Sequence, residues 1–338
     1  MINSLNIGII GLGLIGEKRI KAISKNKNSN IISVCDTDLK KCKYIANKYK
    51  CEFQTNWKEI LKNKKIDTLV ISVPNYLILP ISKKAIQNKK NVLIEKPMGK
   101  NLKEAEVIYK LAKKSNKIFK VGFNHRYYPS IMLAYKKFLN GEIGEIINIR
   151  AVYGHGGRPG YQNEWRGDKS KSGGGELTDQ GVHVLDLVNL FCGVPKYVSC
   201  FTQTAVWPLN KIEDNAFCNL IYKDVHVQLH TSWTQWKNKF SFEIFGKKGS
   251  LVIDGIGGNY GREKLVSYKR NIKGGKPYKN TKYFNSKNIT WIKEWDDFLQ
   301  AIKKKKSVFF ADEMDGLKVM KLVNALYLSK DKKKIIKI

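Results

Sequence analysis

The fold is decided by the stretch Asn6-Ile-Gly-Ile-Ile-Gly-Leu-Gly-Leu-Ile-Gly16 near the start of the chain. Its first residues predict a buried strand over Asn6–Ile10, and the residues that follow predict a helix. Gly11 permits a tight turn, Gly13 lets backbone N–H groups approach a pyrophosphate, and Gly16 lets helix and strand pack closely. A phosphate at a helix N-terminus meets unpaired N–H groups and a favourable dipole. The stretch predicts a dinucleotide site; the alternative is an ordinary glycine-rich turn.

Further residues extend this predicted site and select its coenzyme. We expect Leu14 and Ile15, in the first helical turn, to lie beside the phosphates. Asp36 ends the second predicted strand 20 residues after the last glycine, which is the spacing of a carboxylate that binds the adenosine ribose. A carboxylate accepts hydrogen bonds from both ribose hydroxyls but repels a 2′-phosphate. NAD is therefore favoured over NADP, although Lys40 or Lys41 could still reach a phosphate.

The two halves of the chain have different patterns. Up to residue 124, short apolar strands alternate with amphipathic helices, as in a parallel sheet covered on both faces. After residue 143, long β-rich runs with plausible hairpin turns at Lys223-Asp224 and Gly246–Gly249 predict an antiparallel sheet. The fold class is α/β, with a doubly wound Rossmann domain (residues 1–124) and an α+β domain (residues 125–338). The last predicted helix, residues 312–328, could return to the domain junction, and residues 271–280 are expected to form an exposed loop.

The charge is unusual, but it does not name a function. The chain has 62 Lys and Arg against 29 Asp and Glu, a formal net charge of +33. Only seven of the basic residues are Arg, and the lysines are spread through all parts of the chain, so we interpret them as a solvated surface. A nucleic-acid-binding protein is the alternative suggested by charge alone, and we expect only weak, nonspecific association.

The cysteines and the apolar runs give no sign of an extracellular or membrane protein. Six cysteines show no Cys-x-x-Cys pair and no zinc-like spacing, so we expect reduced thiols and no metal. The apolar start Ile7–Ile15 lacks the basic flank of a signal peptide, and the longest uncharged apolar run, Leu69–Ser82, is too short to span a bilayer. We expect a cytoplasmic protein.

Two further segments carry candidate catalytic groups. Lys96 lies in Glu95-Lys96-Pro97 at the carboxyl end of a buried strand, the edge at which doubly wound sheets bind ligands. A glycine-rich loop then leads into a helix on which Asp179 and His183 are four residues apart, hence on one face, with Asp186 three residues further on. A carboxylate and an imidazole together suit acid–base chemistry. The structural alternatives are a Lys–Glu pair, an N-capping Asp179 and a core histidine, and a metal site lacks a third ligand.

In order and spacing, these motifs resemble those of the Gfo/Idh/MocA oxidoreductases over nearly the whole chain. The resemblance implies that Lys96 is the catalytic lysine, Asp179 the substrate-binding aspartate and His183 the catalytic histidine. It also implies a large open sheet in the second domain, often used for homodimer or homotetramer contacts. Pro74-Asn75 matches a turn beside the cofactor, and Glu95 lies in the same cofactor region. The histidine commonly found three residues after that Asn is Ile78 here.

The few arginines suggest the substrate. Four of the seven lie between residues 126 and 166, in or beside the segment that leads to the catalytic helix. Guanidinium groups bind carboxylate or phosphate, and aromatic rings stack on sugars. We hypothesise an acidic or nucleotide-activated sugar, as in surface-polysaccharide metabolism; neutral sugars, and arginines that simply pair with carboxylates, are the alternatives. The candidate substrate-binding residues, besides Asp179 and His183, are Arg126, Tyr128, Arg158, Tyr161, Trp165 and Arg166.

Two rival functions keep the same fold. One is an enzyme whose tightly bound NAD is recycled in a net non-redox reaction. The other is a non-catalytic NAD-binding regulator, against which the joint retention of Lys96, Asp179 and His183 argues.

Overall fold

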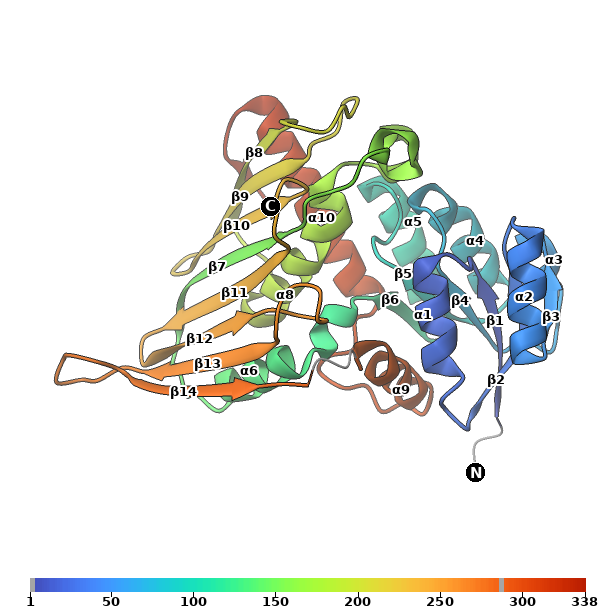
Figure 1. Cartoon of the computed structure of the whole chain (residues 1–338), viewed down its shortest axis with the longest axis horizontal. Coiled ribbons are helices and arrows are strands. Elements are labelled where there is room, and N and C mark those ends of the chain that lie inside the picture. Colours follow the sequence, from blue (N-terminus) through green and yellow to red (C-terminus); the bar gives the residue numbers. More distant parts are fainter. Residues whose placement is uncertain (1–3, 286–288) are drawn as a thin grey trace. The chain divides into compact units, whose positions relative to one another are not determined.

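The computed structural model describes residues 4–285 and 289–338 (Figure 1). They divide into two compact units. Unit 1 takes in Met1–Asn124 and Thr290–Leu317, and unit 2 takes in His125–Ile289 and Lys318–Ile338. Residues 290–317, which the sequence analysis assigned to the second domain, belong instead to unit 1.

Unit 1 is built on six parallel strands in the order β3-β2-β1-β4-β5-β6. The predicted doubly wound parallel sheet is confirmed. The short strand β3 escaped prediction because it has only three residues, two of them exposed. The elements are β1 (Leu5–Ile10), α1 (Leu14–Ile23), β2 (Ser29–Cys35), α2 (Leu39–Tyr49), β3 (Glu52–Gln54), α3 (Trp57–Ile60), β4 (Thr68–Ile71), α4 (Asn75–Gln87), β5 (Asn91–Glu95), α5 (Leu102–Lys113), β6 (Phe119–Gly122) and α9 (Thr290–Ile302).

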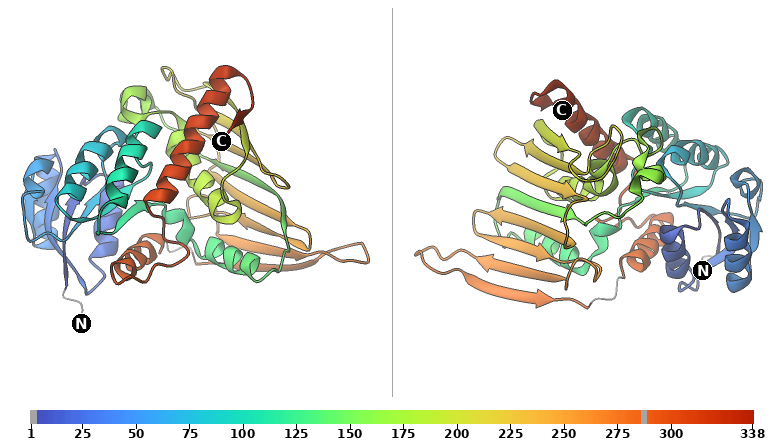
Figure 2. Two further views of the ribbon diagram at one scale, coloured as in Figure 1. Left: turned by 180° about the vertical axis from the view of Figure 1, so that it is seen from behind. Right: turned by 45° about the horizontal axis from the view of Figure 1, so that its top comes forward.

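The helices of unit 1 lie on both faces of its sheet (Figures 1 and 2). Helices α1, α2 and α9 share one apolar core with the strands, and α4 packs beside α5 on the opposite face. Right-handed crossovers place successive helices in this way. The strands accordingly bury side chains on both faces; all four residues of β4, for example, are buried.

Helix α9 belongs to unit 1 because its apolar face completes that core. Trp295 and Phe298 are at most 1% exposed and pack in one cluster with residues of β1 and α1, including Ile7 and Ile20. Residues 291–303 of the sequence have a helical pattern, but such a pattern reveals only that one face is apolar and not which sheet will cover it.

Unit 2 is built on a nine-stranded sheet in the order β14-β13-β12-β11-β7-β10-β9-β8-β15. All its pairs are antiparallel except β7 with β10, so the predicted mainly antiparallel sheet is confirmed. The elements are α6 (Pro129–Leu139), β7 (Ile146–Gly154), α7 (Lys169–Ser172), a π-helical turn η4 (Leu177–Gly181), α8 (Val182–Cys192), β8 (Tyr197–Gln203), β9 (Asn215–Ile221), β10 (His226–Ser232), β11 (Lys239–Gly246), β12 (Gly249–Asp254), β13 (Lys264–Lys269), β14 (Tyr278–Tyr283), α10 (Glu313–Lys332, which begins in unit 1) and β15 (Ile336–Lys337).

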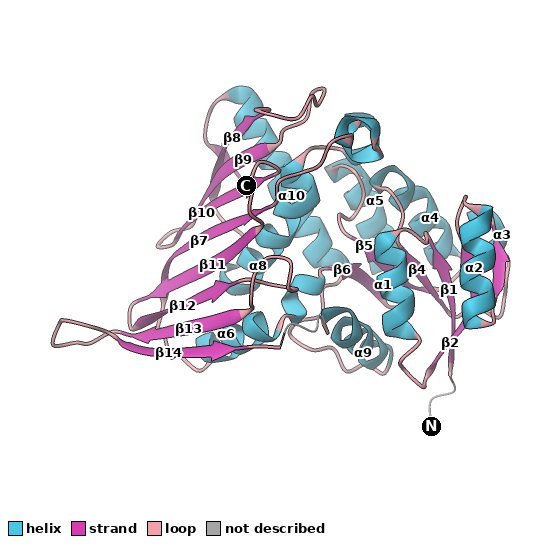
Figure 3. Cartoon of the chain, in the orientation of Figure 1, coloured by secondary structure: helices cyan, strands magenta, loops and turns pink. Residues whose placement is uncertain are grey.

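Helices α6 and α8 cover one face of this sheet, as Figure 3 shows. Burial along β7 alternates accordingly: Ile149, Ala151 and Tyr153 are buried, whereas Arg150 is exposed. Both predicted hairpin turns are present, joining β9 to β10 and β11 to β12. Helix α6 was not predicted. The expected loop of residues 271–280 is a hairpin whose last three residues, Tyr278–Asn280, begin β14.

Phe298 allows a direct test of the place of α9. Phe298→Ala should lower the free energy of unfolding by about 3–5 kcal/mol, because it leaves a cavity in the core of unit 1. Tyr44→Ala, on the exposed side of α2, is the matched control and should change it by about 0.5 kcal/mol or less. Urea denaturation measures both; equal effects would show that α9 is not part of that core.

Candidate active site

The glycine-rich turn between β1 and α1 leaves a helix N-terminus open. Gly11 has φ +90°, and a Cβ there would collide with the backbone of Ser72. A Cβ at Gly16 would collide with the carbonyl oxygen of Gly11, so the start of α1 lies directly against the turn. A Cβ at Gly13, by contrast, would meet nothing within 4 Å. The space over Gly13, the N-cap of α1, suits a ligand phosphate.

Asp36 directly follows β2 and holds this turn in place. One carboxylate oxygen accepts a hydrogen bond from the backbone N–H of Leu12 at 2.6 Å, and the other accepts one from Asp38 at 3.1 Å. The carboxylate is only partly buried, and the oxygen that accepts from Leu12 has a second lone pair for a ribose hydroxyl. Leu14, 72% exposed, and Ile15 begin α1 as expected.

Pro74 and Asn75 begin α4, with Pro74 as its N-cap and Asn75 buried. Ile78, in place of the family's usual histidine, is fully buried in that helix. The turn, the open helix end and the adjacent carboxylate together fit a dinucleotide.

Glu95 has a structural partner that the sequence did not reveal. The Arg19 guanidinium of α1 donates a hydrogen bond from Nε to Glu95 at 2.8 Å, and one of its terminal nitrogens lies 2.6 Å from the same carboxylate oxygen as an ion pair. The guanidinium also binds Glu294 of α9. Arg19 is 2% exposed and Glu294 is fully buried, and this burial raises the pKa of Glu294. The three charges join α1, β5 and α9. Lys96 follows Glu95 directly and is linked to Pro97 by a cis peptide bond.

In unit 2, the predicted Asp–His helix is built in two parts. Asp179 lies in the π-helical turn η4, and His183 lies in the first turn of α8, which continues it. The sequence predicted one continuous α-helix there. The π turn widens the helix, so the two residues share a segment but not the regular α-helical spacing.

A buried carboxylate anchors this π turn. Glu213, just before β9, accepts hydrogen bonds from the backbone N–H of Leu177 at 3.1 Å and from the Tyr327 hydroxyl of α10 at 2.8 Å. Burial raises its pKa. A Cβ at Gly175 would collide with the Glu213 carbonyl oxygen, which explains why a glycine precedes the turn. The sequence analysis missed Glu213. Its position just before a strand, as one of the few acidic residues in a basic chain, is the feature that could have marked it.

His183 lies in an aromatic cluster of unit 2. Its ring stacks on that of His125 with centroids 3.8 Å apart and planes 29° apart. Tyr153 of β7 contacts both histidines, and Phe240 of β11 packs against His125. His183 is 6% exposed and His125 5%. The sequence analysis did not single out His125 or Tyr153.

The predicted substrate-binding arginines are largely held by carboxylates. Arg126 is buried and donates to both oxygens of Asp186, at 2.8 and 2.6 Å, so it ties the start of unit 2 to α8. This pairing is the alternative that the sequence left open, and it removes the geometric basis for Arg126 as a substrate ligand. Arg158 likewise makes two hydrogen bonds of 2.8 Å to Glu164.

Arg166 is the arginine that the structure brings to a candidate catalytic residue. Its Nε lies 3.4 Å from a carboxylate oxygen of Asp179, and its guanidinium stacks on Trp165. Tyr161 is buried against Trp233, and Tyr128 is buried with its ring 5.3 Å from that of His125. Arg166, beside Asp179, and Trp165 are thus partly exposed candidates, whereas Tyr161 and Tyr128 are buried.

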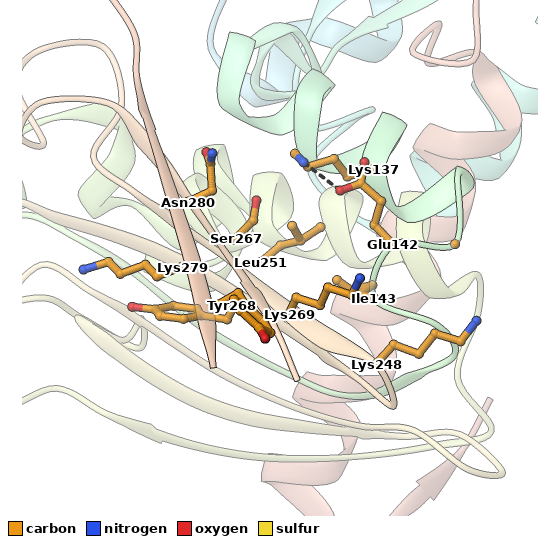
Figure 4. A pocket seen from close by; sticks show the side chains of 12 residues that line it. Lys137, Glu142, Ile143, Lys248, Leu251, Ser267, Tyr268, Lys269, Lys279 and Asn280 are labelled. Carbon is orange, nitrogen blue, oxygen red and sulfur yellow. Dashed lines mark hydrogen bonds and ion pairs between the residues drawn. The ribbon is translucent and has the colours of Figure 1, made fainter. Parts of the chain in front are cut away.

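A pocket of about 490 Å³ lies elsewhere in unit 2, between the end of α6 and strands β12, β13 and β14 (Figure 4). Ile143 and Leu251 line it together with several lysines, and Lys137 is paired with Glu142 across it. It contains none of the predicted site residues, and its lysines match the lysine-rich surface of the whole chain. Over the described part of the chain, no cluster of His, Cys, Asp and Glu suits a metal ion, and no helix could cross a membrane.

Comparisons with known proteins agree with both halves of this description. Residues 5–123 match the family model described as "Oxidoreductase family, NAD-binding Rossmann fold", and residues 132–252 match the GFO/IDH/MocA C-terminal domain. Together the matches take in well over half of the chain. The protein belongs to the Gfo/Idh/MocA oxidoreductase family, which confirms the resemblance, the fold class and NAD as the coenzyme.

The individual relatives share less than a third of their residues with this chain over the matched regions. Levoglucosan dehydrogenase of Pseudarthrobacter phenanthrenivorans is 28% identical over 60% of this chain and 54% of its own length, so the chain spans about half of that relative. The 2,7-anhydro-N-acetylneuraminate hydratase of Escherichia coli is 27% identical over 74% of this chain and 68% of its own length. A structure of levoglucosan dehydrogenase with NADH and levoglucosan superposes with a TM-score of 0.90 over 99% of both chains, at 22% identity, and so shares the fold.

Two glycine substitutions should separate binding from folding. Gly13→Ala should leave stability nearly unchanged yet weaken NADH binding at least ~10-fold, because its methyl group enters the open space above α1. Gly16→Ala should instead destabilise the protein, because its methyl group meets the Gly11 carbonyl. Calorimetric titration with NADH and thermal unfolding would measure these effects; tight binding by Gly13→Ala would place the phosphates elsewhere.

Proposed function

We propose that this protein is an NAD-dependent dehydrogenase or reductase that acts on a CH–OH group, or the corresponding ketone, of a sugar or sugar derivative. The observation that carries the proposal is the presence of Asp179 and His183 on one helical segment in a chain that also holds a complete dinucleotide turn. A protein that only binds NAD has no need of a base and a carboxylate in that position.

Each candidate residue has one role in this reaction. His183 takes the proton of the reacting hydroxyl, so that an O–H bond breaks as an N–H bond forms. Lys96 donates a hydrogen bond to the same oxygen and stabilises its developing negative charge. Asp179 accepts hydrogen bonds from neighbouring substrate hydroxyls and fixes the sugar ring. Bound NAD supplies the hydride acceptor, and in the reverse direction the proton returns from His183.

We infer the substrate class from the groups around Asp179. Arg166 lies beside that carboxylate with 30% of its side chain exposed, and Trp165 offers a ring for stacking on a sugar face. A guanidinium at this position favours a substrate that carries a carboxylate or phosphate, as acidic and nucleotide-activated sugars do. The substrate in the name of the hydratase relative, 2,7-anhydro-N-acetylneuraminate, is an acidic sugar, which supports the same preference.

A second function is favoured by the same relative. A hydratase carries out a net reaction without oxidation, and the match to it covers 74% of this chain. In that case NAD would stay bound and be recycled within each turnover. Absorbance of denatured protein after purification distinguishes the two functions, since only a recycled coenzyme is expected to remain through purification.

We also propose a cytoplasmic homodimer or homotetramer that associates through the open face of the unit 2 sheet. Phe201 of β8 and Phe217 of β9 are 69% and 44% exposed and form a cross-strand pair there. Six free cysteines and a requirement for NAD suit the cytoplasm.

The activity is tested with a panel of sugars. NADH formation at 340 nm should appear with an acidic or phosphorylated sugar, for which N-acetylneuraminate derivatives, UDP-glucuronate and glucose 6-phosphate are the probes. Levoglucosan and myo-inositol are the neutral comparison. Activity on neutral sugars alone would refute the proposed preference for anionic sugars but would still support a dehydrogenase activity.

On the best substrate of that panel, His183→Asn and Lys96→Met should each lower kcat by about 100-fold or more, because each removes a group that handles the reacting proton or oxygen. His226→Gln, an exposed histidine at the start of β10, is the control and should retain full activity. If the variants fold and bind NADH normally, the loss of kcat arises in the chemical step. Near-normal rates in both variants would contradict the catalytic roles of His183 and Lys96.

The preference for NAD over NADP tests the proposed role of the Asp36 carboxylate in binding the adenosine ribose. The wild type should bind NAD at least ~10-fold more tightly than NADP, because the carboxylate repels a 2′-phosphate. Asp36→Asn keeps an acceptor for the Leu12 N–H but removes the charge, so it should narrow or reverse that ratio. Dissociation constants for both coenzymes give the answer, and tighter NADP binding by the wild type would contradict it.

A further inference from the structure

Two imidazoles of unit 2 form a stacked pair. His125, in the 3₁₀ turn over Asn124–Tyr127, and His183, in α8, are 58 positions apart in the chain, yet their ring centroids are 3.8 Å apart. Both rings are at least nine-tenths buried, so solvent water screens a charge on either ring only weakly. At this separation one ring covers a face of the other, and the plane of each ring is set by its neighbour.

Tyr153 fixes the orientation of His125. Its hydroxyl lies 3.2 Å from Nε2 of His125, and its ring packs against both histidines. Burial raises the pKa of Tyr153 well above its usual value, so the phenol stays neutral and can donate or accept as the imidazole requires. Tyr260 packs on Tyr153 and accepts a hydrogen bond from Gln180, the residue after Asp179. The cluster therefore reaches back to the π turn.

The charged groups around the pair are themselves engaged. Arg126, beside His125, is bound by Asp186 of α8, and Asp179 lies against Arg166. Glu176, at the start of the π turn, is buried, and the phenol rings of Tyr128 and Tyr260 also pack against the cluster. Two imidazolium ions stacked at 3.8 Å would repel strongly in such a buried site. Binding of a second proton to the pair is therefore much less favourable than binding of the first.

We propose that His125 is a positioning residue that sets the ring plane of His183 and limits the stacked pair to a single proton. The inference rests on the proposed function, in which His183 takes the hydroxyl proton. When that proton arrives the pair is full, and it must be released before the next oxidation. Oxidation should then fail as the pH falls through the first ionisation of the pair, because the base is already protonated.

Histidine NMR on the protein without substrate tests this directly. The chain has only five histidines, so ¹⁵N-labelled imidazoles can be assigned by single substitutions. In the wild type, the His125 and His183 signals should follow the same two steps, separated by about 2 pH units or more. His125→Phe keeps an aromatic ring against His183 but removes the second proton site, so His183 should titrate in one step. His226→Gln, an exposed histidine on β10, is the control and should leave both steps unchanged.

A second variant guards against misfolding. His125→Gln removes the stacked ring while keeping an amide near Tyr153, and it should also give a single step for His183. In either folded variant, the acid limb of the kcat/KM profile should move together with the new His183 pKa. A merely structural role would leave that profile in place.

The outcomes separate this inference from the proposed function. Independent one-step titrations in the wild type, with His183 unchanged in His125→Phe, would overturn the inference even if the enzyme is an active dehydrogenase. A coupled titration in a protein that oxidises none of the sugars would instead remove the proposed function and with it the catalytic meaning of the pair.

Discussion

The buried Arg19 guanidinium is the interaction on which unit 1 depends. It reaches from the helix that starts at the glycine-rich turn to Glu95, at the end of the strand that carries Lys96, and to Glu294 of α9. The Trp291 ring lies 4.6 Å from the guanidinium carbon. Removing one partner from such a buried set leaves an uncompensated charge and typically costs about 3–5 kcal/mol. The coenzyme turn, the candidate catalytic lysine and a helix from the far end of the sequence thus share one electrostatic anchor.

A second buried carboxylate, that of Glu213, connects separate segments of unit 2. Glu213 holds the backbone of the π turn and the Tyr327 hydroxyl, and Thr178 bonds the same hydroxyl at 3.0 Å. The turn that carries Asp179 is therefore supported from β9 and from α10. Candidate catalytic residues in both units therefore lie in segments that a buried ionic or polar anchor holds in place.

Much of this architecture could be predicted because local patterns determine it. The three glycines of the turn and the alternation of strand and helix up to residue 124 are readable from spacing, whereas the Asp179–His183 segment was predicted as one α-helix and contains a π turn. The partners of individual side chains could not be predicted from the sequence, because they depend on packing between distant segments. The sequence marked Arg126 as a substrate ligand, whereas the fold pairs it with Asp186. Helix α9 was predicted, but its place in the core of unit 1 was not. His125 could not be singled out from the sequence, because its stacking on His183 depends on how two distant segments pack.

In the proposed reaction a hydride passes between a sugar carbon and bound NAD, and His183 takes the hydroxyl proton during oxidation or returns it during reduction. The most direct measurement is mass spectrometry of the coenzyme after turnover with a substrate deuterated at its ring carbons. We expect one deuterium per molecule in the dihydronicotinamide of the NADH formed. Consumption of the substrate without deuterium in NADH would contradict it.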